Sequence, residues 1–426
     1  MLYSGKARCY NVGIEENAER VEVMSKNILV KVKGLWDATG AEMIMDAALL
    51  VRGGKIAAVG SYKALTPMLD GSEEMVDHSE QYVIPGIIDA HTHVVIDPDA
   101  DFTGFVGRDS DTRIAHRGIV NLKKTLDGGV TFIRDLGGYH HIDIELKKLV
   151  DEGKVEGCGL LASGEMITMT GGHGWKLGRE CDGVDEVRKA AREQLKAGAT
   201  LVKIMATGGN LTPGPQGAPQ LSEEEIRAAV EVAHRAGLRT TTHSHSPEGI
   251  KNALYAGIDC IEHGMFIDDE ALDYMKEHNI PYVPTLVGPW ICAEVGEENG
   301  MAPEAVEKCK NATGRHQQNF QKAVARGLFI AMGTDAGTPF AEHGRAYLDE
   351  LELMMKNGLT AREALLCATR NSAVVVGVEK ERGTLEAGKW ADFLVLDENP
   401  LENIKTLRTI AEVYQTGRRV ERKYYV

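Results

Sequence analysis

Eight short apolar runs, separated by stretches of helical periodicity, occupy the middle of the chain. The runs lie at residues 83–88, 130–133, 159–162, 201–205, 239–242, 259–261, 281–285 and 328–332. Strand-like runs that alternate with amphipathic helices are typical of βα units built on a parallel sheet. Eight consecutive units predict an α/β fold of the TIM-barrel type, a (β/α)₈ barrel. One helix is expected over residues 222–236, where Ser222 and Glu225 form a capping box.

The two ends of the chain have a different sequence pattern from the middle. Short alternating segments broken by glycine lie at residues 28–32, 46–51, 55–59, 391–396 and 410–414. This pattern predicts short β-strands joined by tight turns. We expect the N- and C-terminal segments to form one small β-sandwich together.

These patterns divide the 426 residues into three parts. Residues 83–383 are predicted to form the barrel, which suits the roughly 250 residues typical of this fold with some insertions. Residues 26–82 and 384–426 are predicted to form the β-sandwich. Residues 1–25 are predicted to be an N-terminal extension, and the sequence assigns it no role.

Composition narrows the class of partner. The chain has 48 Lys and Arg against 63 Asp and Glu, a net charge of −15, so its field repels nucleic-acid phosphates and anionic lipid surfaces. We therefore expect a small-molecule substrate, with neither nucleic acid nor membrane as a partner. The seven cysteines form no C-x-x-C pair, and no stretch approaches the about 20 apolar residues of a membrane span. A cytoplasmic location is expected.

Active sites of (β/α)₈ barrels lie at the carboxyl ends of the strands, so titratable residues there are the first candidates. His91 and His93 follow the first strand, and residues two apart on a strand point to the same side and can share a metal ion. Lys203 lies within an apolar strand, where a charged ammonium is costly to bury. It either pairs with a carboxylate or loses its proton and adds carbon dioxide, giving a carbamate that can bridge two metal ions.

Three further candidates end later strands. His243 ends the fifth, His263 the sixth and Asp335 the eighth. Each alone suits a structural role, a hydrogen-bonded core histidine or a helix N-cap. Together with His91, His93 and Lys203 they place ligand-capable side chains at one rim of the predicted barrel, which favours a metal centre.

As an ordered set, the motifs that carry these residues resemble the amidohydrolase superfamily, and within it the group related to imidazolonepropionase that includes prolidase-like enzymes, arginine- or lysine-releasing carboxypeptidases and ochratoxin-type amidases. The motifs are Pro85-Gly86-Ile87-Ile88-Asp89-Ala90-His91-Thr92-His93, Thr131-Phe132-Ile133-Arg134-Asp135, Gly171-Gly172-His173-Gly174, Val202-Lys203-Ile204, Thr242-His243-Ser244-His245, Glu262-His263-Gly264, Gly333-Thr334-Asp335-Ala336-Gly337 and Gly388-Lys389-Trp390-Ala391-Asp392. The resemblance runs from about residue 27 to the C-terminus.

The resemblance implies two divalent metal ions per chain. The implied ligands are His91, His93 and Asp335 for one ion, His243 and His263 for the other, and Lys203, as N6-carboxylysine, for both. We expect Zn²⁺, and Mn²⁺ or Co²⁺ would suit the same nitrogen and oxygen ligands, so the identity of the metal stays open. A hydroxide bridging the ions would be the nucleophile, and Asp335 would take its proton and pass it to the leaving amine.

Other residues are candidates for substrate contacts or for support. His140 or His141, His173, His245 and Arg345 are the candidates for holding a substrate carbonyl or carboxylate, although loop histidines and Arg345 equally suit solvated surface positions. Asp89 and Arg134 are expected to brace the metal ligands. Leu221 stands where prolidase-like members tend to have tyrosine, which argues against a proline-type carboxylate clamp.

These observations favour a metal-dependent hydrolase that cleaves the amide bond of a dipeptide or N-acyl amino acid. A deaminase is the nearest alternative, but ring deaminases typically resemble one-metal sites without the strand-four lysine. A carbamate or urea-type hydrolase needs the same nucleophile and stays open. A non-catalytic scaffold would have lost ligands, and all six are present. The resemblance also implies a homo-oligomer.

Overall fold

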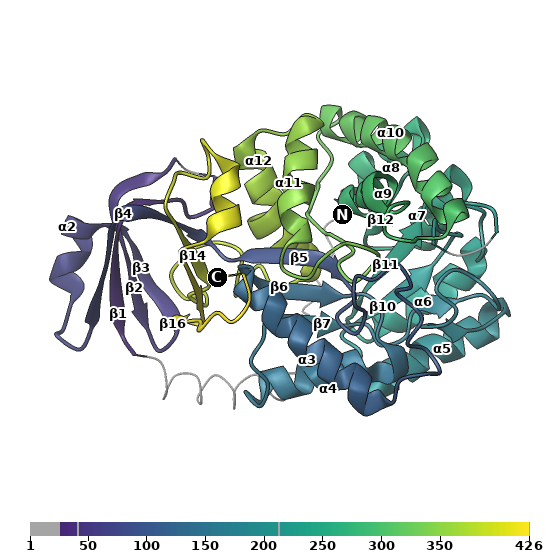
Figure 1. The fold of residues 1–426 in the computed structure, drawn as a ribbon, viewed down its shortest axis with the longest axis horizontal. Helices are drawn as coiled ribbons and strands as arrows, with labels where there is room; N and C mark the ends of the chain where they lie inside the picture. The colour runs from purple at the N-terminus through teal and green to yellow at the C-terminus, as the bar shows by residue number, and fades with distance from the viewer. Residues whose placement is uncertain (1–25, 41, 212–213, 426) are drawn as a thin grey trace.

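The computed structural model describes residues 26–40, 42–211 and 214–425. The predicted N-terminal extension, residues 1–25, lies outside the described residues. In the described part the chain is an α/β protein with one large mixed sheet and two sheets of parallel strands. The large sheet lies at one end of the molecule in Figure 1.

The mixed sheet brings together the two ends of the chain. Its strands, in the order β16-β15-β14-β4-β1-β2-β3, are β16 (Arg418–Arg419), β15 (Glu412–Gln415), β14 (Phe393–Leu396), β4 (Glu74–Pro85), β1 (Ile28–Leu35), β2 (Ile44–Arg52) and β3 (Lys55–Ser61). The junction is the antiparallel pair β14–β4, in which Phe393 lies opposite Pro85. Hydrogen bonds thus join all seven strands into one sheet. The predicted sandwich and the predicted domain limits stay predictions.

Both faces of this sheet are buried near its centre. On β1, Val30 and Val32 pack into one apolar cluster with Phe393, whereas Leu29 packs into a second cluster on the other face. The short helix α2 (Tyr62–Leu65) contributes Leu65 to the second cluster. Alternate residues of a strand point to opposite faces, so a strand covered on both sides is a nearly continuous apolar run.

The parallel strands form two hydrogen-bonded sheets. One has the order β5 (Ile87–Thr92), β6 (Val130–Asp135) and β7 (Gly159–Ala162). The other has the order β13 (Tyr282–Val283), β12 (Ile261–His263), β11 (Arg239–Ser244), β10 (Leu201–Met205), β8 (Ile167–Thr168) and β9 (Arg179–Glu180). Seven of the eight predicted apolar runs overlap these strands.

The eighth predicted run, residues 328–332, forms no strand of its own. It makes an isolated parallel bridge from Ile330 to Tyr282, and the Met332 carbonyl accepts from the Ala90 amide at 3.0 Å. It therefore contacts strands of both parallel sheets. The Met332 amide instead donates to the carbonyl of Cys367, outside the sheets, so no regular ladder forms.

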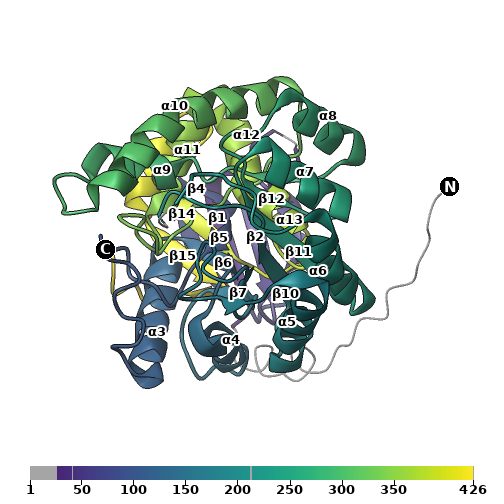
Figure 2. The same ribbon diagram turned by 90° about the vertical axis from the view of Figure 1, so that its right-hand side faces the viewer.

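Helices cover the parallel strands. They are α3 (Asp111–Asp127), α4 (Ile142–Asp151), α5 (Gly183–Ala197), α6 (Glu223–Arg235), α7 (Pro247–Ala256), α8 (Asp269–His278), α9 (Val287–Val295), α10 (Pro303–Ala325), α11 (Ala346–Lys356), α12 (Ala361–Leu366) and α13 (Ser372–Val376). Figure 2 shows β5, β6, β7, β10, β11 and β12 gathered in the middle with helices around them. The predicted capping box of Ser222 and Glu225 is confirmed at the start of α6. Among the described helices, none has the length and apolar character needed to cross a bilayer.

Phe393 tests the joint between the two chain ends. Its ring is fully buried and stacks on Tyr414 with centroids 4.3 Å apart. Phe393→Ala should lower the free energy of unfolding by about 3–5 kcal/mol, because it leaves a cavity in the sheet. Met75→Ala is the matched control: Met75 lies on the same sheet but is 50% exposed, so the change in stability should be less than about 0.5 kcal/mol. Denaturant unfolding measures both, and equal losses would contradict the shared core.

Candidate metal centre

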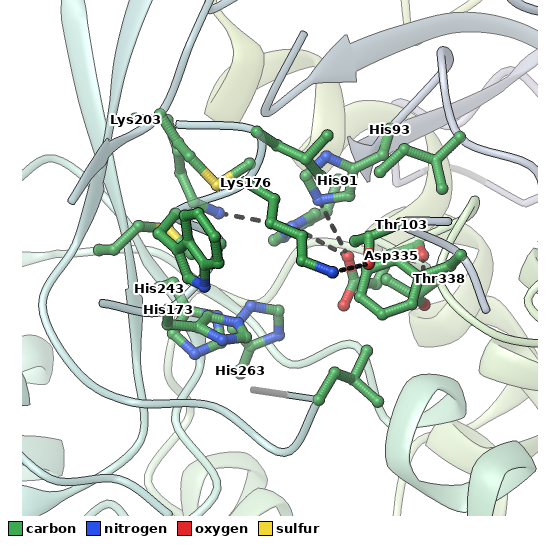
Figure 3. Close-up of a pocket in the computed structure, with 18 residues that line it drawn as sticks. His91, His93, Thr103, His173, Lys176, Lys203, His243, His263, Asp335 and Thr338 are labelled. Atoms are coloured by element: carbon green, nitrogen blue, oxygen red, sulfur yellow. Dashed lines mark hydrogen bonds and ion pairs between the residues drawn. The ribbon is translucent and has the colours of Figure 1, made fainter. Parts of the chain in front are cut away.

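All six predicted metal ligands line one cavity. His91, His93, Lys203, His243 and His263 project into it from strands of the two parallel sheets or the residues that follow them, and Asp335 projects from the loop after residues 328–332 (Figure 3). His91 lies on β5, Lys203 on β10, and His243 on β11. The sheet register brings Lys203 and His243 close, because Met205 of β10 lies opposite His243. Strand pairing therefore gathers the ligand-capable residues of β10 and β11, and the cavity joins them to those of the other parallel sheet.

His91, His93 and Asp335 form the tightest group. The Oδ1 atom of Asp335 lies 3.3 Å from Nε2 of His91 and 3.2 Å from Nε2 of His93. Backbone hydrogen bonds hold this arrangement: the Asp335 amide donates to the His91 carbonyl, and the His93 amide donates to the Ala336 carbonyl, each at 2.8 Å. The three side chains offer ligand atoms within 4.8 Å of one another, a spacing that one metal ion can fill.

Lys203 is fully buried beside this group. Its Nζ lies 3.5 Å from Nε2 of His91 and the residue is 1% exposed. Burial lowers the pKa of the Lys203 ammonium to about 8, although the carboxylates of Glu262 and Asp335 oppose this shift. A lowered pKa makes the neutral amine accessible near neutral pH, and only the neutral amine can add carbon dioxide.

A group of histidines faces Lys203 across the cavity. The ring of His243 lies 4.2 Å from that of His173, 4.3 Å from that of His245 and 4.5 Å from that of His263. Burial, followed by the mutual repulsion of the rings, lowers the pKa of His243 well below its ordinary value. These imidazoles are therefore neutral at physiological pH, which is the form that binds metal.

Hydrogen bonds fix the proton on the outer nitrogen of three of the ligands. The Nδ1–H of His91 donates to Glu262, and that of His93 to the Gly137 carbonyl. The Thr285 hydroxyl donates to the Pro284 carbonyl, so Thr285 Oγ1 accepts from Nδ1–H of His263 at 2.7 Å. In each case Nε2 keeps its lone pair. Nε2 of His243 is buried and has no hydrogen-bond partner among the described residues.

The donor set fits divalent metal ions. It combines neutral imidazole nitrogens, a carboxylate and a lysine that can become a carbamate, which are nitrogen and oxygen ligands suited to Zn²⁺ and its neighbours. The orphaned Nε2 of His243 supports this fit, because an unsatisfied buried polar atom is costly unless a ligand completes it.

Two of these residues have unusual backbone conformations. His263 has φ of 64° and Asp335 has φ of 60°, in the left-handed region that side chains other than glycine seldom adopt. At His263 the turn follows directly on Glu262, whose side chain also points to the site. Strained backbone of this kind persists where the surrounding structure enforces it, and it concentrates at functional sites.

Glu262 is a site residue that sequence reasoning missed. Its fully buried carboxylate accepts from Arg134 Nη2 at 2.6 Å and from His91 Nδ1 at 2.9 Å. Although burial opposes it, Arg134 and His91 lower the pKa of Glu262 to about 2, so the pair stays ionised. Glu262 thus orients His91. Its place next to a candidate ligand was the available signal, but alternation along a strand predicts that neighbours point to opposite sides.

The two residues expected to brace the ligands are both buried next to them. Asp89 accepts from the backbone amides of His91 and Thr334 at 3.1 Å and from the Thr334 hydroxyl at 2.6 Å. It thereby links β5 to the segment that carries Asp335. Arg134 donates through Nε to the Ala90 carbonyl at 2.6 Å and pairs with Glu262.

The predicted substrate contacts divide into two groups. His173 lines the cavity, and His245 is buried directly behind His243 and His263. His140 is instead half exposed and pairs with Asp111 at 2.9 Å, and Arg345 stacks on Tyr425 at 4.4 Å.

Neither His140 nor Arg345 is among the described residues that line the cavity. His141, the alternative to His140, also lies elsewhere and contacts Gln194 at 2.9 Å. The physical reason is loop geometry: His140 and His141 both have positive φ, at 53° and 58°, and the resulting turn directs them to other partners. In this structure His140 and Arg345 therefore lie apart from the cavity, and their role as substrate contacts stays a prediction.

Comparisons with known proteins agree with this geometry. The model of the amidohydrolase family matches residues 82–420. The chain belongs to this family. The resemblance drawn from the sequence motifs is thereby confirmed, and the protein is a hydrolase that acts on carbon–nitrogen bonds.

Individual amidohydrolase relatives cover nearly the whole chain. Ochratoxinase from Aspergillus niger is 32% identical over 90% of this chain and 85% of its own length. Imidazolonepropionase from Agrobacterium fabrum is 26% identical over 86% of this chain and 87% of its own length. The crystal structure of a Xaa-Pro dipeptidase with bound methionine has a TM-score of 0.85 and 29% identity, covering 93% of this chain and all of that one.

Glu262→Gln tests the role of Glu262 in orienting His91. The amide cannot neutralise Arg134, so we expect a loss of about 3–5 kcal/mol in stability from the broken buried pair. We also expect metal affinity to fall roughly tenfold to hundredfold, because His91 loses its fixed orientation. Thermal unfolding and metal titration measure the two effects. The control is Arg134→Met combined with Glu262→Gln, which should recover stability but not metal affinity; wild-type affinity in the single variant would refute the role.

Proposed function

We propose that this amidohydrolase is a binuclear, metal-dependent enzyme that hydrolyses the amide bond of a dipeptide or an N-acyl amino acid. The observation that carries the proposal is the burial of Lys203 between two groups of ligand-capable side chains. Its Nζ faces the group of His91, His93 and Asp335 on one side, and the cluster around His243 on the other (Figure 3). A carbamate at this point would serve both groups.

The proposal includes the architecture that holds the site. We propose that the strands of both parallel sheets, with residues 328–332 between β13 and β5, act as one (β/α)₈ barrel. The hydrogen bonds from residues 328–332 to Tyr282 and Ala90 support this closure on one side. On the other side, the Thr200 amide donates to the Ala162 carbonyl at 2.8 Å, between β10 and β7. A cytoplasmic, homo-oligomeric enzyme is part of the same proposal.

The residues divide between the two ions as the family pattern implies. His91, His93 and Asp335 would hold one ion, His243 and His263 the other, and carboxylated Lys203 would contact both. Bound divalent ions, Zn²⁺ in the proposal, would supply Lewis acidity toward the scissile carbonyl and lower the pKa of water. The remaining chemistry belongs to the side chains of this chain.

Asp335 is suited to proton transfer. Although burial disfavours its charge, His91, His93 and Lys203 hold the pKa of its carboxyl well below the usual range. It is therefore ionised at neutral pH and available to accept a proton from the attacking water. Transfer of that proton to the nitrogen of the scissile bond would let the C–N bond break, because this nitrogen is a poor leaving group until it is protonated.

His173 is suited to hold the substrate carbonyl. Its ring lines the cavity and lies 4.2 Å from that of His243, at the edge of the ligand set. Its backbone amide donates to Gln220 Oε1 at 2.9 Å, which positions the loop that carries it. Burial lowers the pKa of His173 to about 4, so the ring acts as a neutral group.

The relatives support an amide that contains an amino acid. The matched crystal structure is a Xaa-Pro dipeptidase that holds methionine in its active site. Leu221, where prolidase-like enzymes tend to have tyrosine, is 1% exposed and has no side-chain hydrogen-bonding group. It cannot hold a proline carboxylate, so we propose that proline is not the preferred residue.

Asp335→Asn tests proton transfer. The amide keeps the shape of the carboxylate but cannot accept the proton, so kcat should fall by roughly 10²–10⁴-fold. Elemental analysis should still find bound metal in this variant. An unchanged kcat with the metal retained would refute the role of Asp335.

Lys203→Ala tests the bridge. Wild-type protein should contain about two metal ions per chain, and the variant about one or fewer, because the shared ligand is lost. The metal content of proteins purified in parallel gives the answer. Lys176→Ala, at the same cavity but outside the ligand set, is the control and should keep its metal. Two ions and full activity in Lys203→Ala would contradict the carbamate.

The experiment that tests the proposed reaction is a substrate screen. The metal-loaded enzyme is offered dipeptides and N-acyl amino acids, and released primary amine and ammonia are followed in parallel. We expect amine release. Ammonia without amino acid would make the protein a deaminase, and no product in either channel would reject amide hydrolysis of amino-acid substrates.

A further inference from the structure

Two loops form the walls of the cavity, and within them the sequence assigned a role to His173 alone. The first, residues 169–178 between β8 and β9, carries Trp175, Lys176 and Leu177, and the second, after β5, carries Phe102 and Thr103. No sequence pattern marked these wall residues, because loop residues far apart in the chain meet only through the fold.

The first loop has a defined conformation. The Leu177 amide donates to the Gly174 carbonyl at 2.8 Å, and the Leu177 side chain is 4% exposed. Gly174 has φ of 70°, which this turn requires, and the His173 carbonyl accepts from the Thr168 hydroxyl at 2.9 Å. Trp175 and Lys176 are thus held at the cavity between two anchored residues.

Among the described residues, the ammonium of Lys176 has no acidic partner. Its Nζ donates to Thr103 Oγ1 at 3.4 Å, the contact drawn in Figure 3. Across the described residues, no carboxylate oxygen lies within 4.0 Å of this ammonium. The cavity is lined by two other charged side chains, Lys203 and Asp335, and both belong to the proposed metal centre. In a chain of net charge −15, Lys176 is therefore suited to meet an anion from outside.

The rest of the wall is apolar. The apolar side chains that line the cavity are Ile96, Phe102, Met166, Trp175, Leu177, Met205 and Leu211. Trp175 lines the cavity and is 44% exposed, so its side chain offers apolar surface to a ligand there. A cavity with apolar walls and one unpaired cation suits a ligand with a bulky apolar group and a single negative charge.

We propose that Lys176 recognises the free carboxylate of an N-acyl amino acid, while Trp175 and Phe102 pack against its apolar side chain or acyl group. The inference rests on the proposed function, because it places this substrate in the same cavity. It adds that the enzyme selects amino acids with a free α-carboxylate and a large apolar group, and that Lys176 is a specificity-determining residue outside the metal centre.

The kinetic test compares N-acetylphenylalanine with its C-terminal primary amide, which keeps the scissile bond but lacks the charge. Lys176→Met should raise KM for the acid roughly tenfold to hundredfold, because a charged hydrogen bond is lost, with kcat nearly unchanged. KM for the amide should change little. Lys176→Arg should keep the preference for the acid. Lys63→Met, on the helix α2 that packs against the mixed sheet, is the control for loss of a surface lysine.

A binding measurement separates this inference from the proposed reaction. Calorimetric titration of the same two compounds into the Asp335→Asn variant, with and without Lys176→Met, requires no turnover. Tighter binding of the acid that disappears with Lys176→Met supports the inference even if the wild-type enzyme hydrolyses neither compound. Two results would overturn the inference even if amide hydrolysis is observed. One is that Lys176→Met weakens binding of the acid and the amide equally. The other is that the variant with Lys176 intact binds the acid no more tightly than the amide.

Discussion

The site depends on the burial of one lysine among neutral imidazoles. Water is excluded from Lys203, so its pKa falls to about 8, and the same exclusion lowers the pKa of the surrounding histidines. Neutral nitrogen lone pairs therefore face an amine that can lose its proton. Exposed to solvent, the same residues would keep ordinary pKa values and Lys203 would stay an ammonium, so the chemistry follows from where the fold places them.

A second set of interactions keeps these groups in position. The ion pair of Arg134 and Glu262 is buried next to the ligands, and Glu262 fixes the orientation of the His91 ring through a hydrogen bond. Asp89 ties the end of β5 to the segment before Asp335. Because His91, His263 and the segment before Asp335 are held by neighbours that are themselves buried and bonded, this part of the site is organised before any ion or substrate binds.

Much of this could be predicted from the sequence, for a physical reason. Five of the six proposed ligands end or follow an apolar run and Lys203 lies within one. The ends of parallel strands meet at one edge, so position along the chain implied proximity in space. The seven runs that form strands owe their regularity to continuous burial.

Other features depend on contacts that no local pattern contains. The run at residues 328–332 is apolar, but the Met332 amide donates a hydrogen bond to the Cys367 carbonyl outside the sheets. The run therefore makes an isolated bridge where a strand was predicted. His140 and Arg345 follow predicted strands in sequence, yet their side chains contact Asp111 and Tyr425 outside the cavity. The sequence did not indicate a role for Lys176, because its contact with Thr103 joins two loops that lie far apart in the chain.

The central claim is that Lys203 joins two metal ions, and anomalous diffraction from crystals of the metal-loaded enzyme tests it most directly. The account predicts two anomalous peaks, one among His91, His93 and Asp335 and one at His243 and His263, with density for a carboxylated Lys203 between them. A single peak beside an unmodified Lys203 ammonium would contradict it.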